Sequence, residues 1–482
     1  MDLDTRAEAQ RQIGLFQRKL ARGIAKVAIA VLVSFLVVLI PDWIGWSAFK
    51  ELDADGRFTL GLLAFAAFLW ITEAIPAFAV AVLVIGLEVV VLGMPGGFFA
   101  STGDTKAWQQ FVEPWASPLM WLFLGGFVLA SGTEKTGLDR WVAASVLSKA
   151  SGSPVAILAT SMGITFLLSM FMSNTATATM MIAVLAPLVA TGAGGKQFAT
   201  ALYLAIPIAA NVGGMATIIG TPPNALASTE LGEQGFKDIA SFAGWMKIGV
   251  VPSLFLGGFS FLYLWIRYLR KAPDSSPPAL THEPRDPTPE ERIQFFVVVI
   301  VFLTTVVLWM TESLHGIPAP VTAFFPMVAF AATGVLGPHD VRKLPWDILL
   351  LLGGGLALGK AVQVTGLAEW MGNLIPDTWT GLPLMIGFGL LAVLLSNLMS
   401  NTATASLLIP LGVGLAGESE LAALLALIAM SCSSAMALPI STPPNAVAYS
   451  TGKVRSQDFL EIGLIMAILG PAISIIWINI VT

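Results

Sequence analysis

Ser173-Asn174-Thr175-Ala176-Thr177 is a short polar stretch inside a long apolar run, and the same five residue types return as Ser400-Asn401-Thr402-Ala403-Thr404. We call these two stretches the SNT segments. Side-chain amides and hydroxyls in such apolar surroundings are costly unless they line a cavity or hold a ligand. A polar segment that occurs twice in this setting is therefore a candidate binding site.

The chain around the SNT segments has the composition of a polytopic membrane protein. Of its 482 residues, 56% are hydrophobic and 11% are charged, whereas about 25% are charged in ordinary soluble domains. The lipid bilayer is therefore the expected surrounding of the chain. The basic residues are scattered and the net charge is −5, so a nucleic-acid partner is not expected.

Apolar runs approach the ~20 residues needed to cross a bilayer at many points along the chain. The first follows a basic N-terminal tail without a small-residue cleavage site, so we expect an uncleaved span. The later crossings are expected at residues 58–75, 77–93, 118–131, 198–219, 242–269, 293–311, 321–336, 348–361, 421–440 and 459–480. Blocks 154–190 and 383–416 contain the SNT segments and are expected to be re-entrant hairpins. The predicted fold is all-α, with about eleven transmembrane helices and two hairpins.

Further landmarks occur once in each half of the chain. Trp70-Ile71-Thr72-Glu73 matches Trp309-Met310-Thr311-Glu312, and Gly125-Gly126 matches Gly354-Gly355. These glycines are expected to allow close helix packing. The segments Thr221-Pro222-Pro223-Asn224 and Thr442-Pro443-Pro444-Asn445, the TPPN segments, form another pair. We therefore expect a tail (1–26), a first span with an outer loop (27–57), a first repeat (58–270), a linker (271–292) and a second repeat (293–482).

The distribution of lysine and arginine predicts the orientation, because positively charged loops stay in the cytoplasm. With both SNT blocks as hairpins, most of the 25 basic residues fall on the side of the N-terminal tail. The protein is then expected in the plasma membrane of the cell, with its N-terminus and its linker on the cytoplasmic side. The second repeat enters the membrane from the side opposite to the first, so the repeats are inverted. Inverted repeats with broken helices are typical of secondary transporters.

The chemistry of the four polar segments fits an anion and a cation bound together. Serine, asparagine and threonine offer neutral donors to a carboxylate and oxygen ligands to a hard cation. The prolines of the TPPN segments are expected to stop helices and to leave free carbonyls near Gly220 and Ser441. No lysine or arginine lies in any of the segments, so a bound Na+ would supply the missing positive charge.

Paired SNT and TPPN segments in two halves joined by a long linker resemble the divalent anion:sodium symporter family. The resemblance covers nearly the whole chain after the first span. It implies homodimers, an elevator-like motion and the following binding residues. Substrate contacts would be Ser173, Asn174, Thr175, Ser400, Asn401 and Thr402. One Na+ site would use Ser169, Ser173, Asn174 and Gly220, and a second would use Ser396, Met399, Asn401 and Ser441. Thr221 and Thr442 either cap the breaks or join the substrate contacts.

Other classes of membrane protein find less support in the sequence. A phosphate-binding loop of the Walker type does not occur, which argues against an ATP-driven pump. The three histidines, His282, His315 and His339, have no ligand or nucleophile spacing, which argues against an enzyme. A ring of charged residues, which would favour a channel, is absent from the sequence pattern, so alternating access is favoured. The working hypothesis is Na+-coupled transport of C4 dicarboxylates such as succinate, malate and fumarate. The alternatives are a Na+-independent exchanger and a citrate or sulfate carrier.

Overall fold

The computed structural model describes residues 3–94, 107–150, 153–192, 194–270, 288–374, 376 and 379–481, with the side chains of residues 3–20, 42 and 107 left outside the description. All regular secondary structure in these ranges is helical, which confirms the all-α fold class. Six of the described helices are long and apolar enough to cross a membrane. The total of eleven crossings stays a prediction, and residues 271–287 of the expected linker lie outside the described part.

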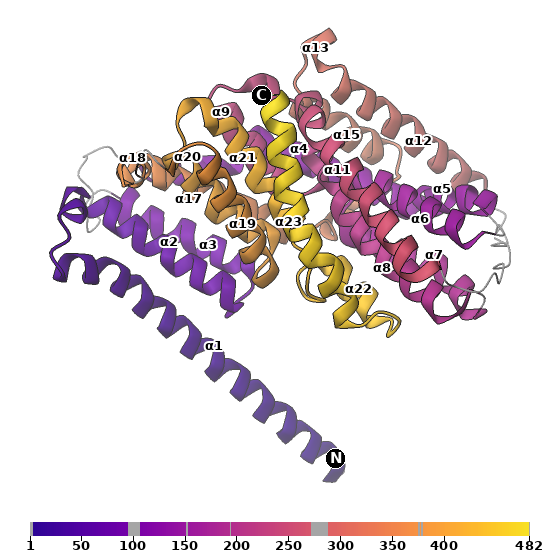
Figure 1. The fold of residues 1–482 in the computed structure, drawn as a ribbon, viewed down its shortest axis with the longest axis horizontal. Coiled ribbons are helices and arrows are strands. Elements are labelled where there is room, and N and C mark those ends of the chain that lie inside the picture. Colours follow the sequence, from indigo (N-terminus) through magenta and orange to yellow (C-terminus); the bar gives the residue numbers. More distant parts are fainter. Residues whose placement is uncertain are drawn as a thin grey trace.

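A long helix, α1 (Leu3–Trp43), and a short turn, η1 (Ser47–Glu51), precede two sets of helices that follow one another in the same order (Figure 1). The first half contains α2 (Ala54–Thr72), α3 (Ala77–Glu88), η2 (Val89–Gly93), η3 (Ala107–Phe111), η4 (Glu113–Ala116), α4 (Pro118–Thr136), α5 (Leu138–Leu147), η5 (Ser148–Ala150), α6 (Pro154–Ser169), α7 (Asn174–Ala190), α8 (Gly195–Gly214), η6 (Ile218–Gly220), α9 (Pro222–Glu233), α10 (Lys237–Ala240), α11 (Phe242–Leu264) and η7 (Trp265–Leu269).

The second half repeats this order with small local differences. It contains α12 (Pro289–Met310), α13 (Glu312–His315), α14 (Ala319–Thr322), α15 (Phe324–Ala332), α16 (Pro338–Arg342), α17 (Trp346–Val364), α18 (Leu367–Asn373), α19 (Leu382–Leu398), α20 (Asn401–Leu415), α21 (Glu418–Ser433), α22 (Pro443–Ser450) and α23 (Ser456–Val481). The run expected at 321–336 therefore lies in two short helices, α14 and α15. The runs expected at 198–219 and 421–440 lose helical structure early, at Gly214 and Ser433.

Two helical hairpins carry the SNT segments. Helices α6 and α7 turn at residues 170–173, and α19 and α20 turn at residues 399–400. The four helices have 16, 17, 17 and 15 residues, so each is about 22 to 26 Å long at 1.5 Å per residue. That is shorter than the ~30 Å hydrocarbon core. Each hairpin packs against the broken helix that follows it, α8 in the first half and α21 in the second.

The two halves form close helix contacts with each other at the duplicated glycines of α4 and α17. A Cβ added at Gly125 of α4 would lie 2.7 Å from the Cβ of Ala323, and one added at Gly354 of α17 would overlap Ala81 of α3. Helix α4 of the first half therefore packs on α14 and α15 of the second, while α17 of the second half packs on α3 of the first. Only glycine allows backbones to approach so closely, so the expectation of close packing is confirmed.

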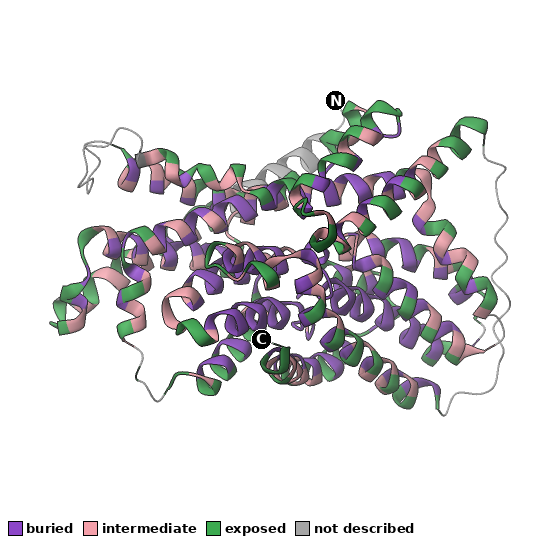
Figure 2. Ribbon diagram, turned by 90° about the horizontal axis from the view of Figure 1, so that it is seen from above, coloured by how far each residue is buried: buried purple, intermediate pink, exposed green. Residues whose placement is uncertain are grey.

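The buried core lies in the middle of the molecule, and the ends of the helices are exposed (Figure 2). Helix α8 is the most enclosed of the long helices, since all its residues from Phe198 to Gly214 are buried. Helix α1 is the opposite case. It packs along α2 and then extends beyond the body of the molecule (Figure 1), and only 6% of its apolar window is buried within the chain. An apolar helix this exposed needs lipid around it.

Candidate functional site

Each of the four polar segments lies at the beginning of a helix. Ser173 caps α7, where its hydroxyl accepts a hydrogen bond from the backbone three residues further on, and Ser400 caps α20 in the same way. Thr442 caps α22, and Thr221 precedes α9. Free N–H groups and the positive end of the helix dipole make such positions favourable for anions. The SNT and TPPN segments thus contribute four helix N-termini.

The TPPN segments were expected to stop helices, and this expectation is wrong. Helix α8 ends at Gly214 and α21 ends at Ser433, well before the prolines. Pro222 and Pro443 are instead the first residues of α9 and α22. Proline suits the first position of a helix, because the N–H that it lacks would have no partner there.

The asparagine of each TPPN segment holds the broken backbone in place. Asn224 Nδ2 lies 3.0 Å from Gly214 O and 2.8 Å from Thr217 O. Asn445 Nδ2 donates in the same way to the carbonyls of Met436 (3.1 Å) and Leu438 (3.0 Å). Both asparagines are fully buried. Sequence reasoning missed this role, although the duplication of the segment pointed to both residues.

The residues expected for the first Na+ site gather around the tip of the first hairpin. Ser169 Oγ donates to Asn174 Oδ1 at 2.5 Å and lies 2.8 Å from Ala210 O of α8. A Cβ on Gly214 would lie 2.6 Å from Asn174 Oδ1 and 2.8 Å from Thr221 Cγ2. The side chain of Asn174 therefore fits closely against the end of α8 and beside the first TPPN segment.

A second contact joins the same hairpin to the broken part of α8. Thr217 donates a short hydrogen bond to the carbonyl of Met170, and its hydroxyl accepts one from Gly220 N at 3.1 Å. Thr217 is fully buried and was not predicted. Gly220, which was predicted, lies directly against Gly214. The turn of the hairpin and the break of α8 thus form one connected unit.

The residues expected for the second Na+ site are arranged differently. Ser441 Oγ donates to Asn397 Oδ1 at 2.9 Å, and the same oxygen accepts from Ala437 N at 2.9 Å. Asn397 was not predicted, because the corresponding position of the first half is Met170 and the repeat gives no signal there. Met399 is buried and lies in extended backbone immediately before the second SNT segment.

Ser396 and Asn401 do not reproduce the direct bond between Ser169 and Asn174. Among the described residues, Asn401 Oδ1 has no hydrogen-bond partner, and Ser396 Oγ has none of good geometry, with the sulfur of Cys432 beside it as a weak acceptor. Both oxygens are buried. Leaving such acceptors unpaired is costly, so the second hairpin offers two oxygen atoms to a ligand.

The remaining predicted substrate contacts lie at the two hairpin tips. Ser173, Thr175 and Thr402 are half-buried and Ser400 is exposed, while Thr221 and Thr442 are buried. The hydroxyl of Thr221 has no hydrogen-bond partner in the described part of the chain. These side chains are therefore accessible at the tips and enclosed at the breaks.

The two halves meet directly between α8 and the second TPPN segment. Asn211 of α8 is 1% exposed, and its Nδ2 donates to Thr442 Oγ1 at 3.1 Å. The same Nδ2 lies 3.5 Å from Asn445 Oδ1. Helix α7 also packs against α22, and α20 packs against α9. Each hairpin therefore contacts the TPPN helix of the other half.

The donors present at the site suit Na+. Hard cations prefer oxygen ligands, and the site offers hydroxyl, amide and carbonyl oxygens. Several buried oxygens among them lack partners in the described residues, including Asn211 Oδ1, Thr221 Oγ1, Asn224 Oδ1, Ser396 Oγ and Asn401 Oδ1. No group of three or more His, Cys, Asp or Glu side chains that could bind a metal ion occurs in the described part of the chain. The chemistry favours a weakly held monovalent ion over a transition metal.

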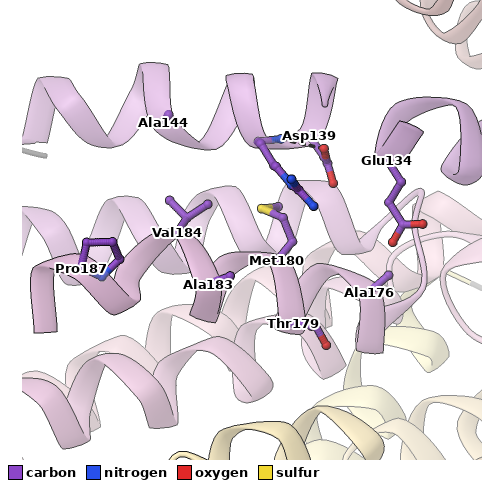
Figure 3. A pocket seen from close by; sticks show the side chains of 10 residues that line it. Glu134, Asp139, Ala144, Ala176, Thr179, Met180, Ala183, Val184 and Pro187 are labelled. Atoms are coloured by element: carbon purple, nitrogen blue, oxygen red, sulfur yellow. Dashed lines mark hydrogen bonds between the residues drawn. The ribbon is translucent and has the colours of Figure 1, made fainter. Parts of the chain in front are cut away.

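A cavity of about 640 Å³ leads to the first SNT segment (Figure 3). It is enclosed by α7 on one side and by α4 and α5 on the other, with Ala176 and Thr179 of α7 at its wall, only a few residues beyond Asn174. Glu134 and Arg140 also line it. Asp139, on α5, accepts a hydrogen bond from Arg140 N at 2.7 Å, and burial raises the pKa of its carboxyl above the usual range.

The matching helices of the second half pack closely together. Helix α17 packs along α20, and a Cβ on Gly355 would overlap the side chain of Ser406. The matching pair in the first half is Gly126 and Thr179, by the offsets of the duplicated segments. There, Thr179 is exposed and Gly126 lies nearest to Ile219 instead. The helix contact that is closed in one half is open in the other.

Comparison with known proteins gives a consistent picture. The model of a citrate transporter family, CitMHS, matches residues 63–431, more than half of the chain. The sodium-dependent dicarboxylate transporter SdcS of Staphylococcus saprophyticus subsp. saprophyticus is 28% identical over 461 residues, which cover 88% of this chain and 86% of the relative. The protein of the same name from Staphylococcus aureus is 29% identical over 465 residues, 89% of this chain and 86% of the relative.

A solved structure shares the fold. The YdaH transporter of Alcanivorax borkumensis, whose crystal structure is described as having an unusual topology, aligns with a TM-score of 0.54 at 14% identity. The alignment covers 89% of this chain and 99% of that chain. At this low identity the likeness concerns the helical architecture alone.

Proposed function

This chain belongs to the citrate transporter family, and from that premise we propose that it carries C4 dicarboxylates such as succinate, malate or fumarate across the membrane together with Na+. Its family and its relatives are transporters, and the chain is likewise a multi-pass membrane transporter and not an enzyme. The observation that carries the proposal is the pairing of two SNT segments, each at the N-terminus of a hairpin helix that is too short to cross the bilayer.

The four helix N-termini support an anionic substrate. Each brings free N–H groups and a partial positive charge of roughly half a unit, and the accessible SNT side chains add neutral hydrogen-bond donors. The direct contacts that we propose for the dicarboxylate are Ser173, Asn174, Thr175, Ser400, Asn401 and Thr402, with Thr221 and Thr442 behind them. Both carboxylates of a C4 dianion would then be bound by donors from the two halves.

Sodium is proposed as the coupling ion because the polar segments contain no positive side chain. One ion would bind at Ser169, Ser173, Asn174 and the carbonyl of Gly220, and the other at Ser396, Met399, Asn401 and Ser441. The unpaired oxygens of Asn401 and Ser396 support the second site. Bound cations offset the charge of the dianion, so we propose that Na+ binds first and the dicarboxylate follows. The names of the staphylococcal relatives point to the same ion and substrate class.

Transport is proposed to occur by an elevator-like motion of the hairpin-bearing helices within inverted repeats. The contrast between the closed pair Gly355 and Ser406 and the open pair Gly126 and Thr179 supports two alternating arrangements. By the positive-inside rule, the cavity beside Arg140 opens toward the cytoplasm. The N-terminus is proposed to lie on that side of the plasma membrane, and the protein is proposed to be a homodimer.

Uptake of radiolabelled succinate into proteoliposomes tests the proposal. We expect uptake that requires an inward Na+ gradient and is competed by malate and fumarate. The second candidate is citrate, which the description of the family model favours. Citrate uptake without competition by succinate would select that candidate, and exchange that proceeds equally well in choline would select a Na+-independent exchanger.

A further inference from the structure

Asn211 stands outside the residues proposed for the substrate and the two Na+ ions, yet it makes the polar contact of α8 with the second TPPN segment. Its amide group is buried, it lies three residues before Gly214, and its Nδ2 faces Thr442 Oγ1 at 3.1 Å and Asn445 Oδ1 at 3.5 Å. A buried amide that connects the two halves at this point can affect the substrate directly through Thr442.

The orientation of the Asn211 amide is fixed by its neighbour. Asn445 Nδ2 donates to two backbone carbonyls, of Met436 and Leu438. Its NH2 group is therefore occupied, and its Oδ1 is the atom turned toward α8. Opposite an acceptor, Asn211 must present its NH2 group, because two amide oxygens facing each other would repel. The assignment of donor and acceptor thus follows from the hydrogen-bond network.

This arrangement determines what the hydroxyl of Thr442 can do. A threonine hydroxyl accepts two hydrogen bonds and donates one. Thr442 Oγ1 accepts from Asn211 Nδ2 at 3.1 Å and from Asn445 N at 3.4 Å, so both acceptor positions are used by N–H groups. No acceptor for the proton of its own O–H group is present in the described part of the chain. The hydroxyl is left as a fixed donor, which is the role that a carboxylate requires.

The matching threonine of the first half has no asparagine that orients its hydroxyl. The position that matches Asn211 is Cys432, by the offset between Asn224 and Asn445, and a thiol is only a weak donor. The hydroxyl of Thr221, which matches Thr442, has no hydrogen-bond partner and does not cap its helix. One threonine is therefore oriented by a partner and its counterpart is not.

We propose that Asn211 is a positioning residue for the substrate, which fixes the hydroxyl of Thr442 as a hydrogen-bond donor to one carboxylate of the dicarboxylate. The inference rests on the proposed function, because it assumes an anion at the TPPN segments. It adds that the two ends of the substrate are bound unequally, with the better oriented donor in the second half of the chain.

Initial rates of Na+-driven uptake in proteoliposomes test this role. Asn211→Ala frees the Thr442 hydroxyl to rotate, so we expect KM for the anion that the wild type carries to rise about 10-fold while Vmax changes less than about 3-fold, the scale of one hydrogen bond to a charged group. Asn211→Asp has nearly the same shape but replaces the donor by an acceptor. It would draw the Thr442 proton away from the substrate, so KM should rise about 100-fold or more.

A double-substitution cycle separates positioning from a general structural effect. Thr442→Val removes the hydroxyl and should raise KM, and adding Asn211→Ala to Thr442→Val should raise it no further. Thr442→Ser keeps the hydroxyl, so its KM should lie well below that of Thr442→Val. The matched control is Thr200→Val: Thr200 also lies on α8, is 7% exposed and donates across the halves, to Lys453 O at 2.8 Å. Its loss should leave KM unchanged.

The variants test the role of Asn211, whereas the wild-type protein tests the proposed function, so failure of one can be told from failure of the other. Wild-type uptake with an unchanged KM in both Asn211→Ala and Asn211→Asp would overturn this inference alone, as would additive effects in the double substitution. A fall in Vmax at constant KM would also overturn it, because that result indicates less folded protein. A wild-type protein that carries none of the tested dicarboxylates would overturn the proposed function and this inference together.

Discussion

Ser169 Oγ lies 2.5 Å from Asn174 Oδ1, whereas the matching atoms of Ser396 and Asn401 form no such bond. The two hairpins therefore present different oxygen atoms, although their sequences are nearly the same. In the first, the serine and asparagine satisfy each other and the asparagine rests against Gly214. In the second, both oxygens remain available. If the proposed second Na+ site is real, it should therefore depend more strongly on a bound ion than the first.

Replacing either SNT asparagine should abolish transport without unfolding the protein. Asn174→Ala and Asn401→Ala each remove an amide that we propose to contact both the dicarboxylate and Na+, so uptake in proteoliposomes should fall at least about 100-fold, the scale of two hydrogen bonds to charged groups. Asn479→Ala is the control, because Asn479 is exposed near the end of α23. Wild-type succinate uptake in both variants would reject the site assignment.

Removal of Na+ should remove transport. The polar segments contain no lysine or arginine, so a dianion at the hairpin tips would lack an opposing charge beyond the helix dipoles. Counterflow of labelled succinate, measured with Na+ replaced by choline, should drop to the level of empty liposomes. Undiminished counterflow in choline would indicate an exchanger that needs no cation.

Ser396→Ala should weaken Na+ binding without destabilising the Na+-free protein. The Ser396 hydroxyl is buried and has only the Cys432 thiol beside it, so its removal relieves an unpaired polar group and should leave the melting temperature unchanged or slightly higher. One Na+ bound at the proposed site would stabilise the wild-type protein by about 2.7 kcal/mol at a Na+ concentration 100 times Kd. The variant should lose most of that gain in a thermal melt with and without Na+. An unaltered Na+-dependent shift would remove Ser396 from the site.

A disulfide between residues 126 and 179 should form only in the arrangement that closes the cavity. Thr179 is exposed, and a Cβ at Gly126 meets no atom closer than 3.6 Å, so Gly126→Cys and Thr179→Cys should both be tolerated, in a Cys432→Ala background. If the first half can adopt the contact seen between Gly355 and Ser406, an oxidant should cross-link the pair and stop uptake. A reductant should restore it. Single-cysteine variants treated identically are the control, and absence of any cross-link would argue against alternating contacts.

Gln363→Ala should shift the protein away from the arrangement described here. Gln363 of α17 donates to Glu230 of α9 at 2.8 Å and connects two sets of helices that the elevator proposal requires to slide. Loss of one hydrogen bond is worth about 1 kcal/mol, a roughly fivefold change in the population ratio. A thiol reagent added from the cytoplasmic side should therefore label a cysteine at position 179 more slowly in the Gln363→Ala variant, because the open cavity is less populated. Equal or faster labelling would contradict a stabilising role of this bond.

The duplicated segments predicted much of the architecture. The all-α class, the two short hairpins and the close packing at Gly125 and Gly354 followed from composition, polar interruptions and glycine pairs. Helix boundaries at the breaks did not follow, because proline was interpreted as a terminator and in fact begins α9 and α22. The roles of Asn211 and Asn397 were also missed, since their counterparts are Cys432 and Met170 and the repeat gives no signal at those positions.

The position of the cavity is a different kind of omission. The two halves carry almost the same segments, and under the proposed alternating arrangements a small free-energy difference between two packings would decide which helix contact is closed. Local sequence patterns report which residues can meet, such as Gly355 with Ser406 or Gly126 with Thr179. They do not predict which of the two helix contacts forms. The difference between the closed contact in one half and the open one in the other could therefore be seen only in the structure.

The crossed contacts of Gly125 with Ala323 and of Gly354 with Ala81 have a consequence for how the protein is made. During synthesis the first half reaches the bilayer before the partners of α3 and α4 exist: Gly125 of α4 lacks Ala323, and Ala81 of α3 lacks Gly354 of α17. Neither half completes its own packing, so α3 and α4 lack these contacts until α17 has been translated. Two separately produced halves should therefore accumulate only when both are present in the same membrane.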